Sequence, residues 1–317
     1  MERAIKSIIN QTYQDFECIL IDNNSTDNSY AIATTLAKED NRITITEESR
    51  QGVVFASNTG FQLAKGEFIA RMDADDDAHP ERLRLQAEFL EQYTEFGAVG
   101  GLVEYKSDFQ SFTGFNKYVN WVNSVITYEQ IKINRFIDSP IVNPSAMWRR
   151  ETGKKHGMYK SGDFPEDYEM WLRWLEEGVK ISKVPSYVLK WHDSKNRLTR
   201  NHSIYSDNAF YRIKTFYLSK WLEKNNPFYP NAVIWGASKT SRKRAALLES
   251  YGIKIDAYID TKRTRQIGKP LIYYKNIEEP GKYFILVYVR QWHAKEQIKN
   301  FLHTKKYKEG EHFLFVS

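Results

Sequence analysis

Four aspartates that follow a predicted strand are the residues best suited to chemistry in this sequence. Residues 67–72 are β-rich, and Asp73, Asp75, Asp76 and Asp77 come directly after them. In an open parallel sheet, ligands bind beyond the carboxyl ends of the strands. Carboxylate oxygens are preferred ligands of Mg²⁺ and Mn²⁺, so an Asp-x-Asp here could clamp a metal-bound diphosphate. The alternative is a solvated loop whose last acids cap the next helix.

Acidic residues also stand at the ends of two other predicted elements. Asp22 ends the β-rich run 16–23, where it could accept hydrogen bonds from a nucleobase or a ribose. Glu166 and Asp167 open a helix predicted over residues 165–177. Acids in a first helical turn commonly complement the helix dipole, but a carboxylate near a bound acceptor can also act as a general base. Both roles stay open for this pair.

Three basic or metal-binding candidates lie in the stretch KWHDSKNRLTR, residues 190–200. His192 could bind a metal ion or a diphosphate, although a structural role fits a single histidine equally well. Arg197 and Arg200 are candidate diphosphate partners, because a guanidinium can bridge two phosphate oxygens. Ordinary solvated charge is the alternative for both.

The elements that must position these residues alternate between strands and helices. This alternation predicts strand-helix-strand units with a largely parallel sheet. The predicted strands are 16–23, 43–48, 67–72, 98–105 and 145–149, and the predicted helices are 28–38, 53–65, 80–93, 129–136 and 165–177. We expect residues 106–128 to form a long loop or lid.

A second unit is predicted from residue 228, after turn residues that interrupt a long aromatic helix. Its expected strands are 232–234, 253–259, 284–289 and 313–316, with helices over 239–251 and 294–303. Gly236 is followed about twenty residues later by Asp256 and Asp260, but the dinucleotide fingerprint would need two more glycines. We therefore expect a small Rossmann-like α/β domain for docking or oligomerisation, with an NAD-linked sugar-modifying enzyme as the alternative.

Composition limits the class of protein. The chain has 317 residues and 41% hydrophobic content, enough for a substantial core. A net charge of +6 spread along the chain argues against nucleic-acid binding, while weak attraction to an anionic membrane surface stays open. Cys18 has no disulfide partner, and neither a signal-peptide core nor a run of about 18 apolar residues is present, so we expect a cytoplasmic protein.

Four stretches together resemble the family 2 glycosyltransferases, which are inverting enzymes of the GT-A fold. They are IDNNSTDNS at 21–29, GVVFASNTGFQLAKGEFIARMDADDDAHPERL at 52–83, NPSAMWRRE at 143–151 and FPEDYEMWLRWLEEG at 164–178, in the family's order and spacing. The resemblance implies a GT-A domain over residues 1–227, with a mixed, mainly parallel sheet and flanking helices, and a smaller Rossmann-like domain over 228–317.

The resemblance also implies a reaction, the transfer of a hexosyl group from a nucleotide diphosphate sugar, such as a UDP-sugar, to an acceptor hydroxyl. The acceptor would be a saccharide or a lipid-linked saccharide in cell-surface polysaccharide or lipopolysaccharide synthesis, at the inner face of the membrane. Mn²⁺ or Mg²⁺ would be the cofactor. Carried over by position, Asp22 would contact the nucleobase, Arg71 would help to hold the nucleotide, and Asn58 and Gly60 would shape the donor pocket. Asp73 would contact the ribose and Asp75 would bind the metal ion. Asp167 would be the catalytic base, with Glu166 as its companion at the start of the helix.

The sequence departs from the family's pattern at its start. Family members begin with an apolar strand and a Pro-x-(Tyr/Phe)-Asn turn before the helix that resembles residues 2–11. We therefore expect the first central strand to be missing, which would leave its neighbour with an unpaired edge. This departure keeps open a non-catalytic protein that binds nucleotide sugars or serves as a scaffold.

Overall fold

The computed structural model describes residues 1–107, 113–193, 202–264 and 268–317. The chain forms two compact units, the first of Met1–Ile131 and Pro140–Ser206, and the second of Lys132–Ser139 and Asp207–Ser317. Helix α10 (Asp207–Asn225) belongs to the second unit, where the Trp221 ring lies 5.8 Å from the ring of Phe284. The units therefore divide before α10, earlier in the chain than the boundary predicted at residue 228.

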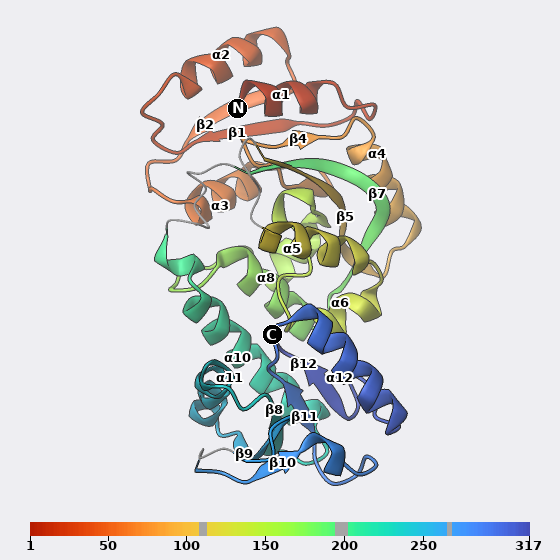
Figure 1. Ribbon diagram of the computed structural model, residues 1–317. Helices are drawn as coiled ribbons and strands as arrows, with labels where there is room; N and C mark the ends of the chain where they lie inside the picture. Colours follow the sequence, from red (N-terminus) through yellow and green to blue (C-terminus); the bar gives the residue numbers. More distant parts are fainter. Residues whose placement is uncertain (108–112, 194–201, 265–267) are drawn as a thin grey trace. The chain divides into compact units, whose positions relative to one another are not determined.

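Helices and strands are interspersed along the chain up to β7 (Figure 1). They are α1 (Glu2–Ile9), β1 (Cys18–Asp22), α2 (Ser29–Glu39), β2 (Ile43–Glu47), α3 (Val53–Leu63), β3 (Phe68–Ala70), β4 (Asp77–Ala78), α4 (Arg82–Gln92), β5 (Phe96–Ser107), α5 (Thr113–Ser124), α6 (Tyr128–Asn134), β6 (Met147–Arg149), α7 (Arg150–His156), α8 (Glu166–Glu176) and β7 (Lys180–Asp193). Among the described residues, no helix is both long enough and apolar enough to cross a membrane.

The first unit holds two sheets. Strands β1 and β2 pair in parallel, and a five-stranded sheet has the order β3-β6-β5-β7-β4. Strands β5 and β7 are parallel, whereas the other three pairings of that sheet are antiparallel. The Gly100–Gly101 pair lets β5 approach β7, because a Cβ at Gly101 would collide with Val188. Strands β3 and β4 lie at opposite edges of this sheet, and residues 71–76 connect them.

Most predicted elements of the first unit are present, but residues 106–128 are not the expected long loop. Helix α5 covers Thr113–Ser124, and Val119 and Val122 on it are buried. Their spacing is helical, yet the many aromatic and asparagine residues around them hid the pattern. Strand β7, over Lys180–Asp193, was not among the predicted strands.

The second unit contains a parallel five-stranded sheet. Its elements after α10 are β8 (Asn231–Trp235), α11 (Lys239–Ala245), β9 (Lys254–Asp260), β10 (Leu271–Tyr273), β11 (Ile285–Val287), α12 (Trp292–Thr304) and β12 (Phe313–Phe315). The order is β10-β9-β8-β11-β12, with every pairing parallel. Chain order thus runs outward from β8 in one direction and then from β11 in the other, which is the doubly wound arrangement. The predicted α/β fold class is confirmed.

Candidate active site

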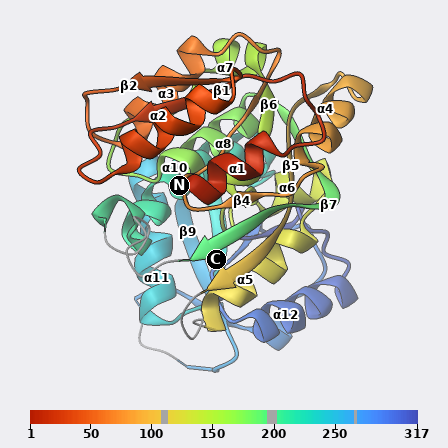
Figure 2. The same ribbon diagram turned by 90° about the horizontal axis from the view of Figure 1, so that it is seen from above.

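The aspartates after β3 converge on one point. Carboxylate oxygens of Asp73, Asp75 and Asp76 all lie within 4.8 Å of one another. Figure 2 shows α1 beside β4, and from α1 the Arg3 guanidinium holds the loop in place. Its Nη2 donates to the carbonyl oxygen of Asp75 at 2.6 Å, and its Nε pairs with Asp77 Oδ1 at 2.6 Å. Three oxygen donors so close together fit the ligand preference of Mg²⁺ or Mn²⁺.

Two arginines offset the repulsion between these carboxylates. Arg71 Nη2 pairs with Asp73 Oδ1 at 2.7 Å. Arg82 is fully buried and donates from Nη2 to the carbonyl oxygen of Ala146 at 3.2 Å. Burial lowers the pKa of Arg82 to about 10, while the charges of Asp76 and Asp73 act in the opposite direction. The loop therefore rests on a buried cation that sequence reasoning did not single out.

His192 contacts the acidic run at a different residue from the one that was predicted to bind metal. Its Nε2 lies 3.0 Å from Asp77 Oδ2, and its backbone N–H donates to Asp76 Oδ1 at 2.8 Å. The antiparallel pairing of β4 with β7 brings these residues together. Within the described part of the chain, the group able to hold a metal ion is Asp73, Asp75 and Asp76, without His192. A metal-binding role for His192 stays a prediction.

Glu166 and Asp167 stand together at the start of α8. Glu166 is buried and accepts a hydrogen bond from the Tyr205 hydroxyl at 2.8 Å. Asp167 Oδ1 accepts the backbone N–H of Tyr168 at 2.7 Å. Loss of solvation, together with the charges of Glu166 and Asp73, raises the pKa of Asp167 to about 8. Burial likewise raises the pKa of Glu166, whereas the Tyr205 hydrogen bond opposes that shift.

These electrostatic effects connect α8 with the acidic loop. The positive charge of Arg71 lowers the pKa of Glu166, and the negative charge of Asp73 raises that of both Glu166 and Asp167. Asp73 in turn shares the carboxylate cluster with Asp75. Five of the predicted site residues are thus linked electrostatically, namely Arg71, Asp73, Asp75, Glu166 and Asp167.

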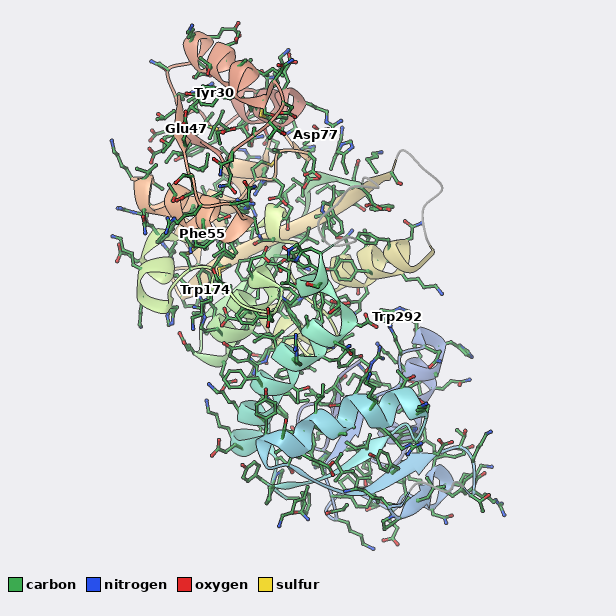
Figure 3. All side chains as sticks on the ribbon, turned by 90° about the vertical axis from the view of Figure 1, so that its left-hand side faces the viewer. Tyr30, Glu47, Phe55, Asp77, Trp174 and Trp292 are labelled. Carbon is green, nitrogen blue, oxygen red and sulfur yellow. The ribbon has the colours of Figure 1, made fainter. Side chains whose placement is uncertain are left out.

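Helix α8 is held rigidly below its first turn. Trp174, labelled in Figure 3, packs edge-on against Trp148 and Trp171, with ring centroids 6.0 Å and 5.5 Å away. Glu169 and Arg173 form a buried ion pair at 3.0 Å, and Arg173 also donates to the carbonyl oxygen of Met158 at 2.6 Å. The helix ends before Gly178, which has a φ of 87° and was predicted as its stop.

We expect Glu169→Gln to destabilise the first unit. The substitution leaves the Arg173 guanidinium buried without its carboxylate, which costs about 3–5 kcal/mol. Urea unfolding, followed by tryptophan fluorescence, measures the loss. Glu176→Gln, near the end of the same helix and only half-buried, is the matched control and should change the free energy of unfolding little. An equal loss in both variants would contradict the assigned role of the buried pair.

Asn58 reaches the same neighbourhood through a tyrosine. Its Nδ2 donates to the carbonyl oxygen of Tyr159 at 2.9 Å, and the Tyr159 hydroxyl donates to Asn143 Oδ1 at 3.0 Å. Burial raises the pKa of Tyr159, and the charges of Arg71 and Asp167 also act on it. Asn58 Oδ1 is buried and has no hydrogen-bond partner among the described residues. A bound molecule could supply that missing donor.

Asp22 lies at the carboxyl end of β1, in a loop that is tied down. Its Oδ2 accepts the Ser25 N–H at 3.4 Å, and Asn23 Nδ2 donates to the carbonyl oxygen of Glu48 at 2.7 Å. A Cβ at Gly60 on α3 would lie 3.5 Å from Ile21, so α3 packs closely on this strand. Within the described residues, no hydrogen bond or ion pair joins Asp22 to the acidic loop. Arg197 and Arg200 lie outside the described residues.

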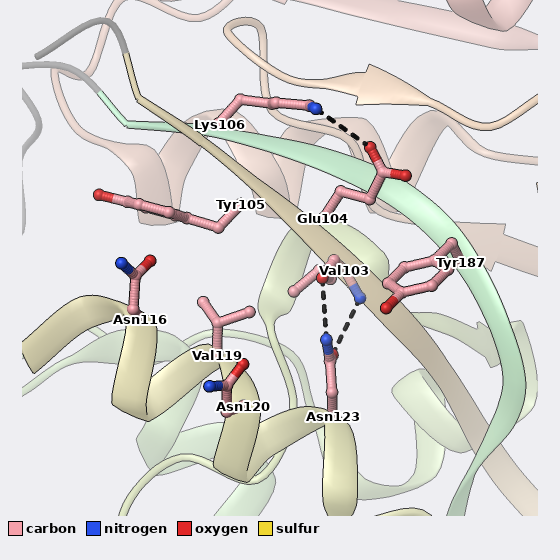
Figure 4. Close-up of a pocket in the computed structure, with 9 residues that line it drawn as sticks. All are labelled: Val103, Glu104, Tyr105, Lys106, Asn116, Val119, Asn120, Asn123 and Tyr187. Carbon is pink, nitrogen blue, oxygen red and sulfur yellow. Dashed lines mark hydrogen bonds and ion pairs between the residues drawn. The ribbon is translucent and has the colours of Figure 1, made fainter. Parts of the chain in front are cut away.

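A separate pocket of about 500 Å³ lies between α5 and the β5–β7 strands (Figure 4). Asn123 on α5 closes one end, since its Nδ2 donates to the carbonyl oxygen of Val103 at 2.9 Å and its Oδ1 accepts the Val103 N–H at 3.0 Å. Glu104 and Lys106 form an ion pair at 3.6 Å beside it. None of the predicted site residues lines this pocket.

Comparison with known proteins defines the class. The model of the family "Glycosyl transferase family 2" matches residues 1–156. The chain is 27% identical over 230 residues to an uncharacterized glycosyltransferase of Haemophilus influenzae, covering 69% of this chain and 71% of the relative. It is 28% identical over 228 residues to the O-antigen biosynthesis glycosyltransferase WbnJ of Escherichia coli, covering 70% and 83%. The protein is a glycosyltransferase. More narrowly, residues 1–156 match glycosyl transferase family 2, the family that the resemblance predicted.

A solved structure shares the fold. The crystal structure of S. aureus TarS 1-349 in complex with UDP-GlcNAc matches with a TM-score of 0.54 and 15% sequence identity. The match covers 78% of this chain and 66% of the TarS chain. At this level of identity the likeness concerns the fold alone, and it confirms the predicted GT-A fold.

Sequence reasoning missed three residues that hold the site together. Arg82 begins a helix whose other buried residues are apolar or amide-bearing, and its partner Ala146 lies 64 residues later in the chain. Tyr159 and Tyr205 lie in segments without a periodic pattern, and Tyr205 is 39 residues from its partner Glu166. The sequence signal for these two tyrosines is that each lies near a motif, and tyrosines near motifs are too common to predict a role in the site.

Proposed function

We propose that this glycosyltransferase moves a sugar from a nucleotide diphosphate sugar to an acceptor hydroxyl, in one displacement that inverts the anomeric carbon. The observation that carries the proposal is the electrostatic proximity of Asp167 to Asp73, which belongs to the acidic cluster. A base for the acceptor and a clamp for the diphosphate then serve a single reaction centre. Asp22 and Asn58 would contact the nucleotide side of the donor.

The acidic cluster is the proposed diphosphate clamp. Asp75, with Asp73 and Asp76, would hold Mn²⁺ or Mg²⁺ through carboxylate oxygens. When bound, such an ion neutralises charge on the diphosphate and favours its departure. Arg71 stays paired with Asp73 and keeps that carboxylate oriented toward the donor. Arg197 and Arg200 are proposed as further diphosphate partners.

Asp167 is the proposed general base. Its ionised carboxylate takes the proton of the acceptor hydroxyl while the hydroxyl oxygen forms a bond to the anomeric carbon. The bond from that carbon to the diphosphate oxygen breaks, and its electron pair leaves with the nucleotide diphosphate. A pKa of about 8 makes Asp167 a far stronger base than an ordinary aspartate, and general bases work best when their pKa lies near the operating pH.

Glu166 sets the pH range of this base. Its negative charge raises the pKa of Asp167, so Glu166→Gln should lower that pKa. Since the base must be ionised, the low-pH limb of the kcat/KM profile should move to lower pH in the variant. Initial rates between pH 5 and pH 9 measure the shift. An unchanged limb, or one displaced to higher pH, would show that Glu166 does not act on the base through its charge.

A donor and acceptor screen tests the proposed function. UDP-sugars come first, because the TarS structure is described in complex with UDP-GlcNAc. Saccharide and lipid-linked saccharide acceptors follow from the name of WbnJ, an O-antigen biosynthesis enzyme. Release of nucleotide diphosphate with Mn²⁺ or Mg²⁺, together with NMR of the product anomer, should show transfer with inversion. A retained configuration would overturn the mechanism, and tight donor binding without transfer would favour a binding protein.

A further inference from the structure

The second unit has a pocket of about 890 Å³ beyond the carboxyl ends of its parallel strands. Trp235 ends β8, Asp260 ends β9 and Tyr288 follows β11, and all three line it. Strand order reverses between β8 and β11, so this is the crevice at which doubly wound sheets bind ligands. We propose that this pocket binds a nucleoside monophosphate through Asp260 on one side and Arg290 with Arg244 on the other.

Asp260 provides the hydroxyl-binding side. It is only 9% exposed, and its Oδ1 accepts the backbone N–H of Lys262 at 2.9 Å, which fixes the carboxylate at the strand end. It follows Gly236 at about the distance at which nucleotide-binding sheets carry the acid for the ribose hydroxyls. Its position favours a ligand that carries a diol.

Two guanidinium groups provide the anion-binding side. Arg244 Nη2 and Arg290 Nη1 both pair with Asp207 Oδ2, at 2.9 Å and 3.1 Å. The single carboxylate of Asp207 thus pairs with two cations, which leaves a net positive charge on this side of the pocket. Arg244 is further held over the Tyr211 ring at 4.2 Å. Guanidinium groups suit the oxygens of a phosphate.

Apolar residues also line this pocket. Ile259, Ile298 and Phe301 line the pocket, and the Phe301 ring packs 5.3 Å from that of Tyr274. This wall fits the flat face of a nucleobase better than a second charged group.

The turn after β8 argues for one phosphate rather than a dinucleotide. Ser238 and Ser241 stand where the fingerprint has its second and third glycines. Ser238 Oγ accepts the Ser241 N–H at 3.1 Å, and Ser241 Oγ donates to the carbonyl oxygen of Tyr288 at 2.9 Å. Gly236 has a φ of 123°, and a Cβ added to it would lie only 3.1 Å from Ser241 Oγ, so the turn is crowded at this point. The serines keep a pyrophosphate from lying against the backbone as it does in NAD sites.

Calorimetric titration of the full chain tests this site independently of the transferase reaction. The protein carries Asp75→Asn and the buffer contains EDTA, so that the proposed donor site is silent. AMP, GMP, CMP and UMP are the probes, with inorganic phosphate, NAD and a 2′,3′-dideoxynucleoside monophosphate as comparators. We expect at least one monophosphate to bind saturably and more tightly than phosphate or NAD. Hydrogen exchange should slow at residues 236–241 and 288–291.

Two variants locate the bound nucleotide. Arg290→Ala, at a side chain 66% exposed, should weaken binding by about tenfold or more, the scale of one lost charge-assisted hydrogen bond. Asp260→Asn should weaken the ribonucleotide similarly and leave the dideoxynucleotide unchanged. Lys282→Ala removes the same charge as Arg290→Ala outside the pocket lining and should have no effect. No saturable binding, equal binding of inorganic phosphate, or binding unaffected by both pocket variants would overturn the proposal.

Discussion

Asp167→Asn is expected to lower kcat by about 100- to 10,000-fold, the usual contribution of a general base. Asparagine keeps the size of the side chain and can still accept the Tyr168 N–H, so the start of α8 should stay in place. The amide cannot take the acceptor proton, and donor affinity should change little because the acidic cluster is untouched. Initial rates and calorimetric donor binding separate the two effects.

Asp163→Asn is the matched control, since Asp163 is an exposed acid just before the same helix. It should keep wild-type kcat. Loss of donor binding together with turnover in Asp167→Asn would assign the residue to the donor pocket. Unchanged turnover would remove it from the mechanism altogether.

Unfolding experiments give an independent check on the same carboxylate. Its folded pKa of about 8 lies above the value of about 3.9 expected for an unfolded aspartate, so the folded state holds the extra proton between these values. Stability contributed by that proton is present below about pH 4 and is lost as the pH rises toward 8. Asp167→Asn should remove this slope, and thermal unfolding between pH 4 and pH 8 measures it.

The sequence predicted those parts of the site that depend on local patterns. The β-rich run before the acids predicted that Asp73 and Asp75 lie just beyond the end of a strand. The proline and two acids before an amphipathic stretch predicted that Asp167 lies at the start of a helix. Gly178 marked the end of α8 because a positive φ favours glycine. Such features follow from backbone conformation and periodicity, both of which act over a few residues.

The contacts that tune the site depend on pairings between distant residues. His192 meets Asp77 only because β7 runs antiparallel to β4, and the sequence contains no signal for that register. Arg82 is buried and donates to the carbonyl oxygen of Ala146, 64 residues further along the chain, although an arginine at the start of a helix is normally exposed. Helix α5 was missed for a different reason: aromatic residues, which also suit strands, obscured the helical spacing of its apolar residues.

Asp75→Asn is expected to weaken metal-dependent binding of the nucleotide diphosphate by at least about 100-fold, since loss of even an outer-shell partner costs 10–100-fold. Asp75 is exposed and is one of the three residues whose oxygens converge. Its backbone carbonyl, not its carboxylate, accepts the hydrogen bond from Arg3. The substitution should therefore leave the loop folded while removing one charged donor from the cluster. Calorimetry with Mn²⁺ and with EDTA measures the metal-dependent part.

Asp77→Asn is the control that distinguishes metal binding by the cluster from a general effect of the negative charge of residues 73–77. Asp77 lies two residues further on, and its carboxylate is engaged by Arg3 at 2.6 Å and by His192 at 3.0 Å. Asp77→Asn removes the same charge from the loop as Asp75→Asn does, but Asp77 is not one of the residues that can hold a metal ion. If both variants lost affinity equally, the run would act as a diffuse negative field. Selective loss in Asp75→Asn, absent in EDTA, ties the affinity to the point where the three carboxylates meet, because a screened field cannot distinguish neighbours this close.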